Sequence, residues 1–286
     1  MTMNPRIIAI IQARMGSSRL PGKVLLEIAG QPMLTRVVER TRRAKTVAEV
    51  VVATTTNASE NPIAGFCKKR GYAFTRGSLY DVLDRYYQTA QQFQANIVVR
   101  ITADCPVIDP ALIDETVDIL LNQYDFTCNR LPPPWHRTYP IGLDTEVCTF
   151  AALEHAWNEA KMPHQREHVM PYLYEGVHLS PLSPQLSTGV SLHGFRVALL
   201  NHDPDYGGLR WTVDTHEDLE FIRQVYTRFS SQNDFTWLDI LDLIKQEPEL
   251  AHINVSVKHK GLHDVDERSA GQSSPASSTH QTDKTC

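Results

Sequence analysis

The chain has 286 residues, of which 42% are hydrophobic, and a formal net charge of −5 at pH 7. This length allows one large buried core, while the mildly acidic balance excludes a general electrostatic attraction to nucleic acid or to an anionic membrane. Because no apolar run approaches the roughly 20 residues that a membrane span needs, we expect a cytoplasmic protein with neither a nucleic-acid partner nor a membrane partner.

Strand-like and helix-like segments alternate along the first half of the chain. Runs rich in β-branched residues predict strands, and apolar residues at a spacing of three to four predict helices. Pro32 and Pro110 suit first helical turns, and Asp109 suits a helix cap. This alternation predicts an α/β fold with a mostly parallel sheet covered by helices. The predicted strands are 6–11, 49–55, 72–77 and 96–102, and the predicted helices are 32–44, one capped by Ser59, 81–93 and one capped by Asp109.

The pattern loosens beyond Asn129, where RLPPPWHRTYP contains three consecutive prolines. Such a run is incompatible with a helix or a central strand, and we expect residues 131–180 to form a small inserted lobe of one domain over 1–255. The segment 261–286 is poor in apolar residues and rich in Ser, Thr and Gln, which predicts disorder. Between them, the predicted strands are 143–150, 194–200 and 210–214, and the predicted helices are 151–160, 166–174, 216–229 and 236–246.

A loop rich in glycine, serine and cations, QARMGSSRLPGK, follows the first predicted strand. Open α/β sheets bind ligands at this end of their strands. Glycine allows close approach of the backbone, and serine and cationic side chains suit phosphate oxygens. The spacing matches neither the P-loop nor the dinucleotide fingerprint. We predict a phosphate loop of a third type, with a solvated turn as the alternative; its residues are Arg14, Gly16, Ser17, Ser18, Arg19, Gly22 and Lys23.

Two aspartates follow predicted strands: Asp104 in VVRITADCP and Asp214 in RWTVDTHEDLE. A bound polyphosphate usually brings Mg²⁺, which one or two carboxylates hold. For Asp214 the alternative is a plain helix cap, since Asp214 or Thr215 can cap the next helix and Glu217 can close a capping box. We predict that Asp104 and Asp214 share one Mg²⁺.

The segment HQREH, residues 164–168, matches the HxxEH pattern of inverted zinc proteases. A zinc site would need a long helix and a distal third ligand, but Pro163 and Pro171 bracket the segment.

The five cysteines contain no CxxC pair, which indicates reduced thiols that fill the core. They are Cys67, Cys105, Cys128, Cys148 and Cys286.

Six motifs occur in order along the chain: IIQARMGSSRLPGKVL, TRGSLYDVLDRYY, RITADCPVIDP, YPIGLDTEV, REHVMPYLY and RWTVDTHEDLEF. With them the chain resembles the cytidylyltransferase family, which includes the CMP-Kdo and CMP-acylneuraminate synthetases. It is most similar to the branch called spore coat polysaccharide biosynthesis protein F. The resemblance covers roughly residues 6 to 245.

The resemblance implies a three-layer α/β/α nucleotidyltransferase (Rossmann-like) fold with a mixed, mostly parallel sheet. It also implies transfer of CMP from CTP to a hydroxyl of an acidic sugar, with Mg²⁺ as cofactor, and a homodimer that uses residues 131–180 as its contact lobe. The better-known sugar-acid synthetases have Pro at the position of Gln12, so their particular sugar is not carried over.

The resemblance further implies a role for individual positions. Arg14, Ser17, Arg19 and Lys23 match phosphate contacts, Ala13 and Arg76 match nucleotide contacts, and Asp104 and Asp214 match metal ligands. We expect four further residues on the acceptor side or at a partner chain: Asp144, Arg166, Glu167 and His168.

Three alternative functions remain open from the sequence. Another nucleotide, such as UTP or GTP, could use the same phosphate loop. A glycosyltransferase would bind a finished nucleotide sugar and never consume free CTP. A non-catalytic nucleotide-binding subunit would bind CTP and Mg²⁺ but release no pyrophosphate.

Overall fold

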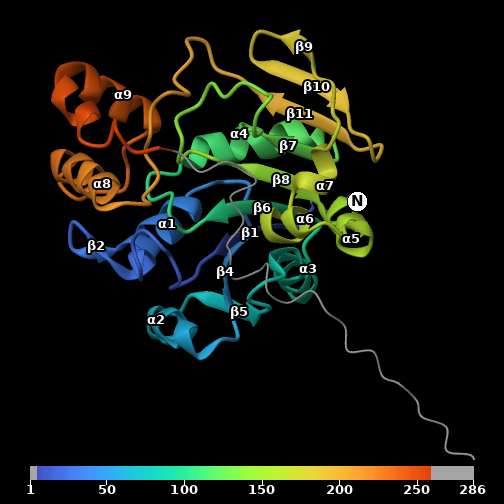
Figure 1. The fold of residues 1–286 in the computed structure, drawn as a ribbon, viewed down its shortest axis with the longest axis horizontal. Helices are drawn as coiled ribbons and strands as arrows, with labels where there is room; N and C mark the ends of the chain where they lie inside the picture. Colours follow the sequence, from blue (N-terminus) through green and yellow to red (C-terminus); the bar gives the residue numbers. More distant parts are fainter. Residues whose placement is uncertain (1–4, 259–286) are drawn as a thin grey trace, which may run out of the picture.

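The computed structural model describes residues 5–258, and one large mixed sheet forms the centre of this part of the chain (Figure 1). Its strands lie in the order β5-β4-β1-β6-β8-β7-β11-β10-β9. Both β8 and β10 run opposite to the other strands, which confirms a mixed, mostly parallel sheet. The strands are β1 (Ile7–Gln12), β4 (Glu49–Thr55), β5 (Ala73–Gly77), β6 (Ile97–Thr102), β7 (Phe126–Cys128), β8 (Glu146–Thr149), β9 (Ser180–Ser183), β10 (Leu186–Val190) and β11 (Arg196–Leu200).

Helices cover both faces of the sheet. One face shares a buried apolar cluster with α1 (Met33–Thr41), α2 (Asn61–Arg70), α4 (Pro110–Leu121), α8 (His216–Arg228) and α9 (Trp237–Gln246). The other face shares a second cluster with α3 (Val82–Gln92), α5 (Phe150–Glu159) and α7 (Pro171–Tyr174). The short α6 (Pro163–His168) joins α5 to α7, and β2 (Glu27–Ile28) pairs with β3 (Gln31–Pro32). These layers confirm the α/β/α architecture.

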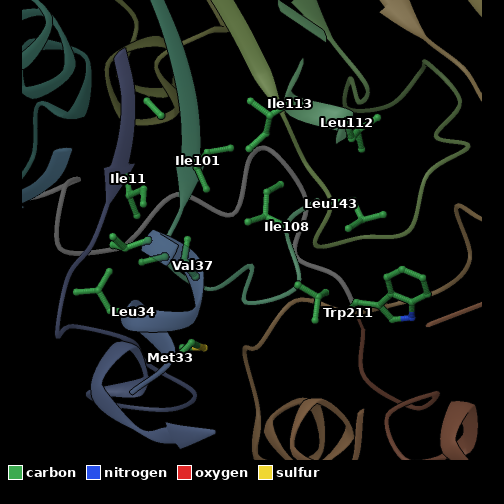
Figure 2. Close-up of a cluster of buried hydrophobic side chains, with 14 of the residues drawn as sticks. Ile11, Met33, Leu34, Val37, Ile101, Ile108, Leu112, Ile113, Leu143 and Trp211 are labelled. Atoms are coloured by element: carbon green, nitrogen blue, oxygen red, sulfur yellow. The ribbon is translucent and has the colours of Figure 1, made fainter. Parts of the chain in front are cut away.

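The continuous apolar run of β1 has a simple cause. Successive side chains of a strand point to opposite faces, so Ile11 enters the first cluster and Ile10 the second. A strand between two helical layers therefore needs apolar residues at every position. Figure 2 shows Ile11 and Ile101 in the first cluster with Leu143 and Trp211, which come from two loops beyond the strands.

Most predicted elements are confirmed, and three details are wrong. Ser59 does not cap α2; the Asn57 side chain accepts from the Ser59 backbone N–H and starts a 3₁₀ turn, Ala58–Glu60, ahead of the helix. The segment 210–214 is not a strand, since only one bridge, between Ile141 and Arg210, pairs it. Residues 166–174 contain two helices rather than one, because Pro171 begins the second.

The hairpin of β9 and β10 is absent from the sequence predictions. Its residues are exposed or only partly buried, so they lack the apolar alternation that marks a strand.

Within the expected lobe 131–180, β8 is a central strand between β6 and β7. The expected disordered segment 261–286 lies outside the described residues. Within the described part of the chain, no helix combines the length and the apolar character that crossing a bilayer requires.

Candidate active site

The glycine-rich loop after β1 folds back on the backbone of Met15. The Met15 carbonyl oxygen accepts from the N–H of Ser17 at 3.1 Å and from that of Gly22 at 2.9 Å, and the Met15 N–H donates to Glu60 Oε2 at 2.7 Å. Gly22 has a φ of 69°, in the left-handed region that favours glycine. Lys23 is the first residue of the 3₁₀ turn that follows, so the fold of the loop positions the Cα atom of Lys23.

Lys23 lies between the two predicted metal ligands. Its Nζ donates to Asp104 Oδ2 at 2.7 Å, to Asp214 Oδ1 at 2.9 Å and to the carbonyl oxygen of Val213 at 2.8 Å. The Lys23 side chain is only 10% exposed, so these charges interact with little screening by water. The loop and two carboxylates separated by 110 residues therefore meet at one point, as the sequence predicts.

Three cations keep the Asp214 carboxylate charged. Besides Lys23, Arg19 Nη2 lies 2.9 Å from Asp214 Oδ2, and Arg210 Nη2 donates to the same oxygen at 2.7 Å. Burial alone would raise the pKa of Asp214, but these cations outweigh it and hold the pKa well below its usual value. Burial would lower the pKa of Lys23, but Asp104 and Asp214 hold it above its usual value.

Backbone contacts position Asp214 beside Asp104. The Asp104 carbonyl oxygen accepts from the Val213 N–H at 2.9 Å and from the Thr212 hydroxyl at 3.1 Å. Thr215 caps α8, as one of the two expected caps, and Asp218 closes the capping box. The prediction of Glu217 as the closing residue and the alternative of Asp214 as a plain cap are therefore wrong. Asp214 thus directs its carboxylate at cations and leaves helix capping to its neighbours.

Gly142 holds a second loop against the segment that carries Asp214. It has a φ of 109°, and a Cβ there would lie 2.5 Å from the backbone N of Thr212. The residue before it is paired through both backbone groups, since Ile141 N–H donates to the Leu209 carbonyl and Trp211 N–H donates to the Ile141 carbonyl. Gly142 therefore makes a close approach that only glycine allows.

Gly142→Ala should lower the free energy of unfolding by about 3 kcal/mol, because strain at positive φ adds to the backbone clash. Urea denaturation measures this change. Gly194→Ala is the matched control, since Gly194 has a φ of 83° but nothing within 4 Å of the added Cβ. It should cost only about 1 kcal/mol; equal losses in the two variants would contradict the close approach.

Comparison with known proteins decides the family of this chain. The sequence pattern of the family described as cytidylyltransferase matches residues 8–245. The chain belongs to the cytidylyltransferase family. The match runs from β1 to within α9, so it includes the loop and both aspartates.

Individual relatives agree with this assignment. The chain is 29% identical over 252 residues to the spore coat polysaccharide biosynthesis protein SpsF of Bacillus subtilis, covering 86% of this chain and 96% of that protein. It is 29% identical over 240 residues to the 3-deoxy-manno-octulosonate cytidylyltransferase of a Psychrobacter species, covering 77% and 82%. A solved cytidylyltransferase from Leptospira borgpetersenii superposes with a TM-score of 0.75 at 31% identity, covering 89% of this chain and 100% of that one.

Two predicted nucleotide contacts of this cytidylyltransferase lie on either side of β4, Ala13 just after β1 and Arg76 in β5. The Ala13 N–H donates to the Ala53 carbonyl at 3.1 Å, which extends the pairing of β1 with β4. Arg76, on β5, donates to the carbonyl oxygens of Thr55 and Asn57. Arg76 thus binds the end of β4 and the segment that follows it. Before Ala13, Gln12 Oε1 is buried and has no hydrogen-bond partner among the described residues.

The REHV segment is engaged with the sheet's second helical layer. Arg166 Nε donates to both Asp81 oxygens, at 3.1 and 3.0 Å, and Asp81 also caps α3. His164, the first residue of the zinc-like pattern, lies 2.8 Å from Glu175 Oε1. Because α6 is only six residues long, the segment is not the long helix that a zinc protease needs. Glu167 lies within α6, and His168 is the last residue of this helix.

Glu175 anchors this region through three side chains. It accepts hydrogen bonds from Gln165 at 2.8 Å and contacts His164 and His193. Burial would raise the pKa of Glu175, but these bonds outweigh it and hold the pKa below its usual value. The bonds therefore stabilise the fold more strongly when Glu175 is ionised than when it is protonated.

Glu175→Gln should lower the free energy of unfolding at pH 7 by roughly 1–2 kcal/mol. Since the folded-state pKa of Glu175 is depressed, its stabilisation is present above the unfolded pKa of about 4.3 and is lost as the pH falls through the folded pKa. Urea denaturation at pH 7 and below pH 4 should show the two proteins converging in acid. A difference in stability that does not change with pH would contradict this account.

Several charged residues beside the site were not predicted. Arg210 joins Asp214 to Asp218, and Arg137 pairs with both oxygens of Asp144. Arg210 stands four residues before Asp214 in the motif RWTVDTHEDLE, which is the one sequence signal that could have identified it. Arg137 lies in the proline-rich loop and offers no such signal.

Proposed function

We propose that this cytidylyltransferase transfers CMP from CTP to a hydroxyl group of an acidic sugar and releases pyrophosphate, with Mg²⁺ as its metal ion. The observation that carries the proposal is the meeting of the glycine-rich loop, Asp104 and Asp214 at the Lys23 ammonium. Two relatives support an acidic sugar and a cytidine nucleotide as substrates. One is named for spore coat polysaccharide biosynthesis, and the other is named as the cytidylyltransferase of 3-deoxy-manno-octulosonate, a sugar acid.

The two aspartates suit Mg²⁺. Oxygens of Asp104 and Asp214 both lie within hydrogen-bond distance of one ammonium group, so they face the same small space. Carboxylate oxygens are the ligands that Mg²⁺ prefers, and it usually takes the rest from phosphates and water. In residues 5–258, no cluster of three or more His, Cys, Asp or Glu side chains could hold a metal by itself, which agrees with an ion that arrives with a nucleotide. When bound, it would neutralise phosphate charge.

The chain's own cations do the remaining work on the triphosphate. Arg19 and Lys23 bind phosphate oxygens and stabilise the charge that builds on the departing pyrophosphate, while an acceptor oxygen attacks the α-phosphorus in line. Arg14 and the Gly16–Ser18 turn line the same phosphates. In this structure the Lys23 ammonium binds both carboxylates; Mg²⁺ held by Asp104 and Asp214 would take its place there, and the ammonium would then bind phosphate oxygens.

The acceptor side is proposed to include Asp144 and the REHV residues Arg166, Glu167 and His168. We also propose that two chains pair through residues 131–180, so that this segment serves both the acceptor and the dimer. Light scattering after size-exclusion chromatography checks the pairing, and a monomer at micromolar concentration would contradict it.

A pyrophosphate-release screen tests the function. The protein is incubated with Mg²⁺, each nucleoside triphosphate in turn, and a panel of acidic sugars and sugar phosphates. We expect release that requires CTP and an acidic sugar together. Release with UTP or GTP but not with CTP would show that the enzyme uses that nucleotide instead. Consumption of a finished nucleotide sugar would indicate a glycosyltransferase. No pyrophosphate release with any acceptor would indicate a non-catalytic subunit.

A further inference from the structure

A row of alternating charges begins on the sheet at β6 and β8 and continues into the segment between β7 and β8. Arg100, on β6, pairs with Glu146, on β8, and the Glu146 side chain is only 4% exposed. Arg130 lies 3.9 Å from Glu146 and 3.5 Å from Asp144, so it links the two carboxylates. Arg137 completes the row, since its guanidinium donates to both oxygens of Asp144. We call these five side chains the arginine relay.

The arginine relay is positioned by the same backbone that positions the metal ligands. Ile141 and Arg210 form a parallel bridge, and from it one segment runs on to Asp144 while the other runs on to Asp214. Gly142, two residues before Asp144, packs against the backbone of Thr212, and the Thr212 hydroxyl donates to the Asp104 carbonyl oxygen at 3.1 Å. An acceptor held by the relay would therefore lie next to the reacting phosphate.

The relay has more hydrogen-bond donors than acceptors. Three guanidinium groups bring about fifteen N–H donors, whereas two carboxylates accept about eight. One consequence is visible at Arg100, whose Nε is buried without a hydrogen-bond partner among the described residues. Donors in excess suit a ligand that is rich in oxygen acceptors, such as a polyol.

The charge of the relay selects among such ligands. Three guanidinium groups against two carboxylates leave a net charge of +1, and the side chains are largely shielded, with Arg137 14% and Arg130 22% exposed. A carboxylate carries one negative charge and neutralises this excess, whereas a phosphate monoester carries about −1.5 to −2 and would overcompensate it. Arginine also binds carboxylates through two parallel bonds.

We infer that the arginine relay is the acceptor subsite of this enzyme, and that Arg130 and Arg137 bind the carboxylate of a polyhydroxylated monocarboxylic acid. Asp144 is a positioning residue, because it holds both guanidinium groups in place until the acceptor arrives. This inference rests on the proposed function, since it assigns residues and a charge class to the acceptor of the same reaction.

The test compares three probes on the full-length protein saturated with CTP and Mg²⁺: gluconate, its neutral counterpart sorbitol, and glucose 6-phosphate. We expect gluconate to raise the melting temperature of the wild type most. Arg137→Gln and Arg130→Gln should each weaken gluconate binding at least tenfold and leave the shift caused by CTP and Mg²⁺ unchanged. Arg228→Gln, which removes an exposed ion pair with Glu247, is the matched control and should bind gluconate as the wild type does.

The outcomes separate the two proposals. If CTP and Mg²⁺ do not stabilise the wild type, the proposed function fails and the subsite fails with it. If they do, but gluconate binds no better than sorbitol or binds equally to Arg137→Gln, the inference is overturned and the proposed function stands. Stronger binding of glucose 6-phosphate than of gluconate would overturn the assignment to a carboxylate.

Discussion

Asp104→Asn and Asp214→Asn, made separately, should each lower the rate of pyrophosphate release with CTP by roughly a thousandfold, equivalent to about 4 kcal/mol of barrier. Asparagine keeps the size of the side chain and removes its charge, so each variant loses a ligand for a divalent ion and a partner of Lys23. Initial rates at saturating CTP and Mg²⁺ measure the effect. Both carboxylates face one ammonium in the structure, so neither variant should be much milder than the other.

Asp242→Asn is the matched control for these variants. Asp242 is 65% exposed and pairs with Lys245 on the surface of α9, so its loss should leave the rate unchanged. Urea denaturation of all three proteins should show cooperative unfolding, which separates a lost ligand from a lost fold. Near-normal pyrophosphate release by both site variants would show that the metal assignment is wrong.

Lys23→Met should make the stability of the protein depend on Mg²⁺. Without the ammonium, the carboxylates of Asp104 and Asp214, 27% and 18% exposed, face each other with one shared partner fewer. Breaking such a buried arrangement costs about 3 kcal/mol in a buffer without divalent ions. Millimolar Mg²⁺ should restore part of this loss in the variant by binding between the carboxylates.

The wild type should show no such response to Mg²⁺ in the absence of nucleotide, because the Lys23 ammonium already occupies that space. Thermal unfolding with Mg²⁺ or with a chelator measures both proteins. Lys245→Met is the control, since Lys245 is 65% exposed and its variant should behave as the wild type. A Lys23→Met protein whose melting temperature is the same with and without Mg²⁺ would contradict the shared cation site.

The sequence predicts the central strands well because burial on both faces leaves a strong pattern. The runs that became β1, β4 and β6 are continuous and β-branched, and the structure places them side by side. The segment 210–214 carries a similar apolar pattern, which predicts a strand there. Trp211 and Val213 are apolar because they enter the core from a loop, and within residues 5–258 the segment is paired through an isolated bridge at Arg210 and not through a ladder.

The candidate site divides in a similar way. Asp104 follows β6, and the carboxyl ends of parallel strands are where such sheets bind ligands. Asp214 was placed there by a predicted strand that is not formed, and it meets Asp104 because the Val213 N–H donates to the Asp104 carbonyl. The contacts of Arg137 with Asp144 and of Arg210 with Asp218 depend on how two irregular loops cross at Gly142. No local pattern encodes such a crossing, so these residues emerge only from the three-dimensional structure.

Binding of Mn²⁺, a spectroscopically visible substitute for Mg²⁺, tests the central claim most directly. Equilibrium dialysis with a non-hydrolysable CTP analogue should show one Mn²⁺ per chain for the wild type, with affinity at least tenfold weaker in Asp104→Asn and in Asp214→Asn. Mn²⁺ bound by both variants as tightly as by the wild type would contradict the account that these carboxylates and the glycine-rich loop form one site for a metal-bound nucleotide.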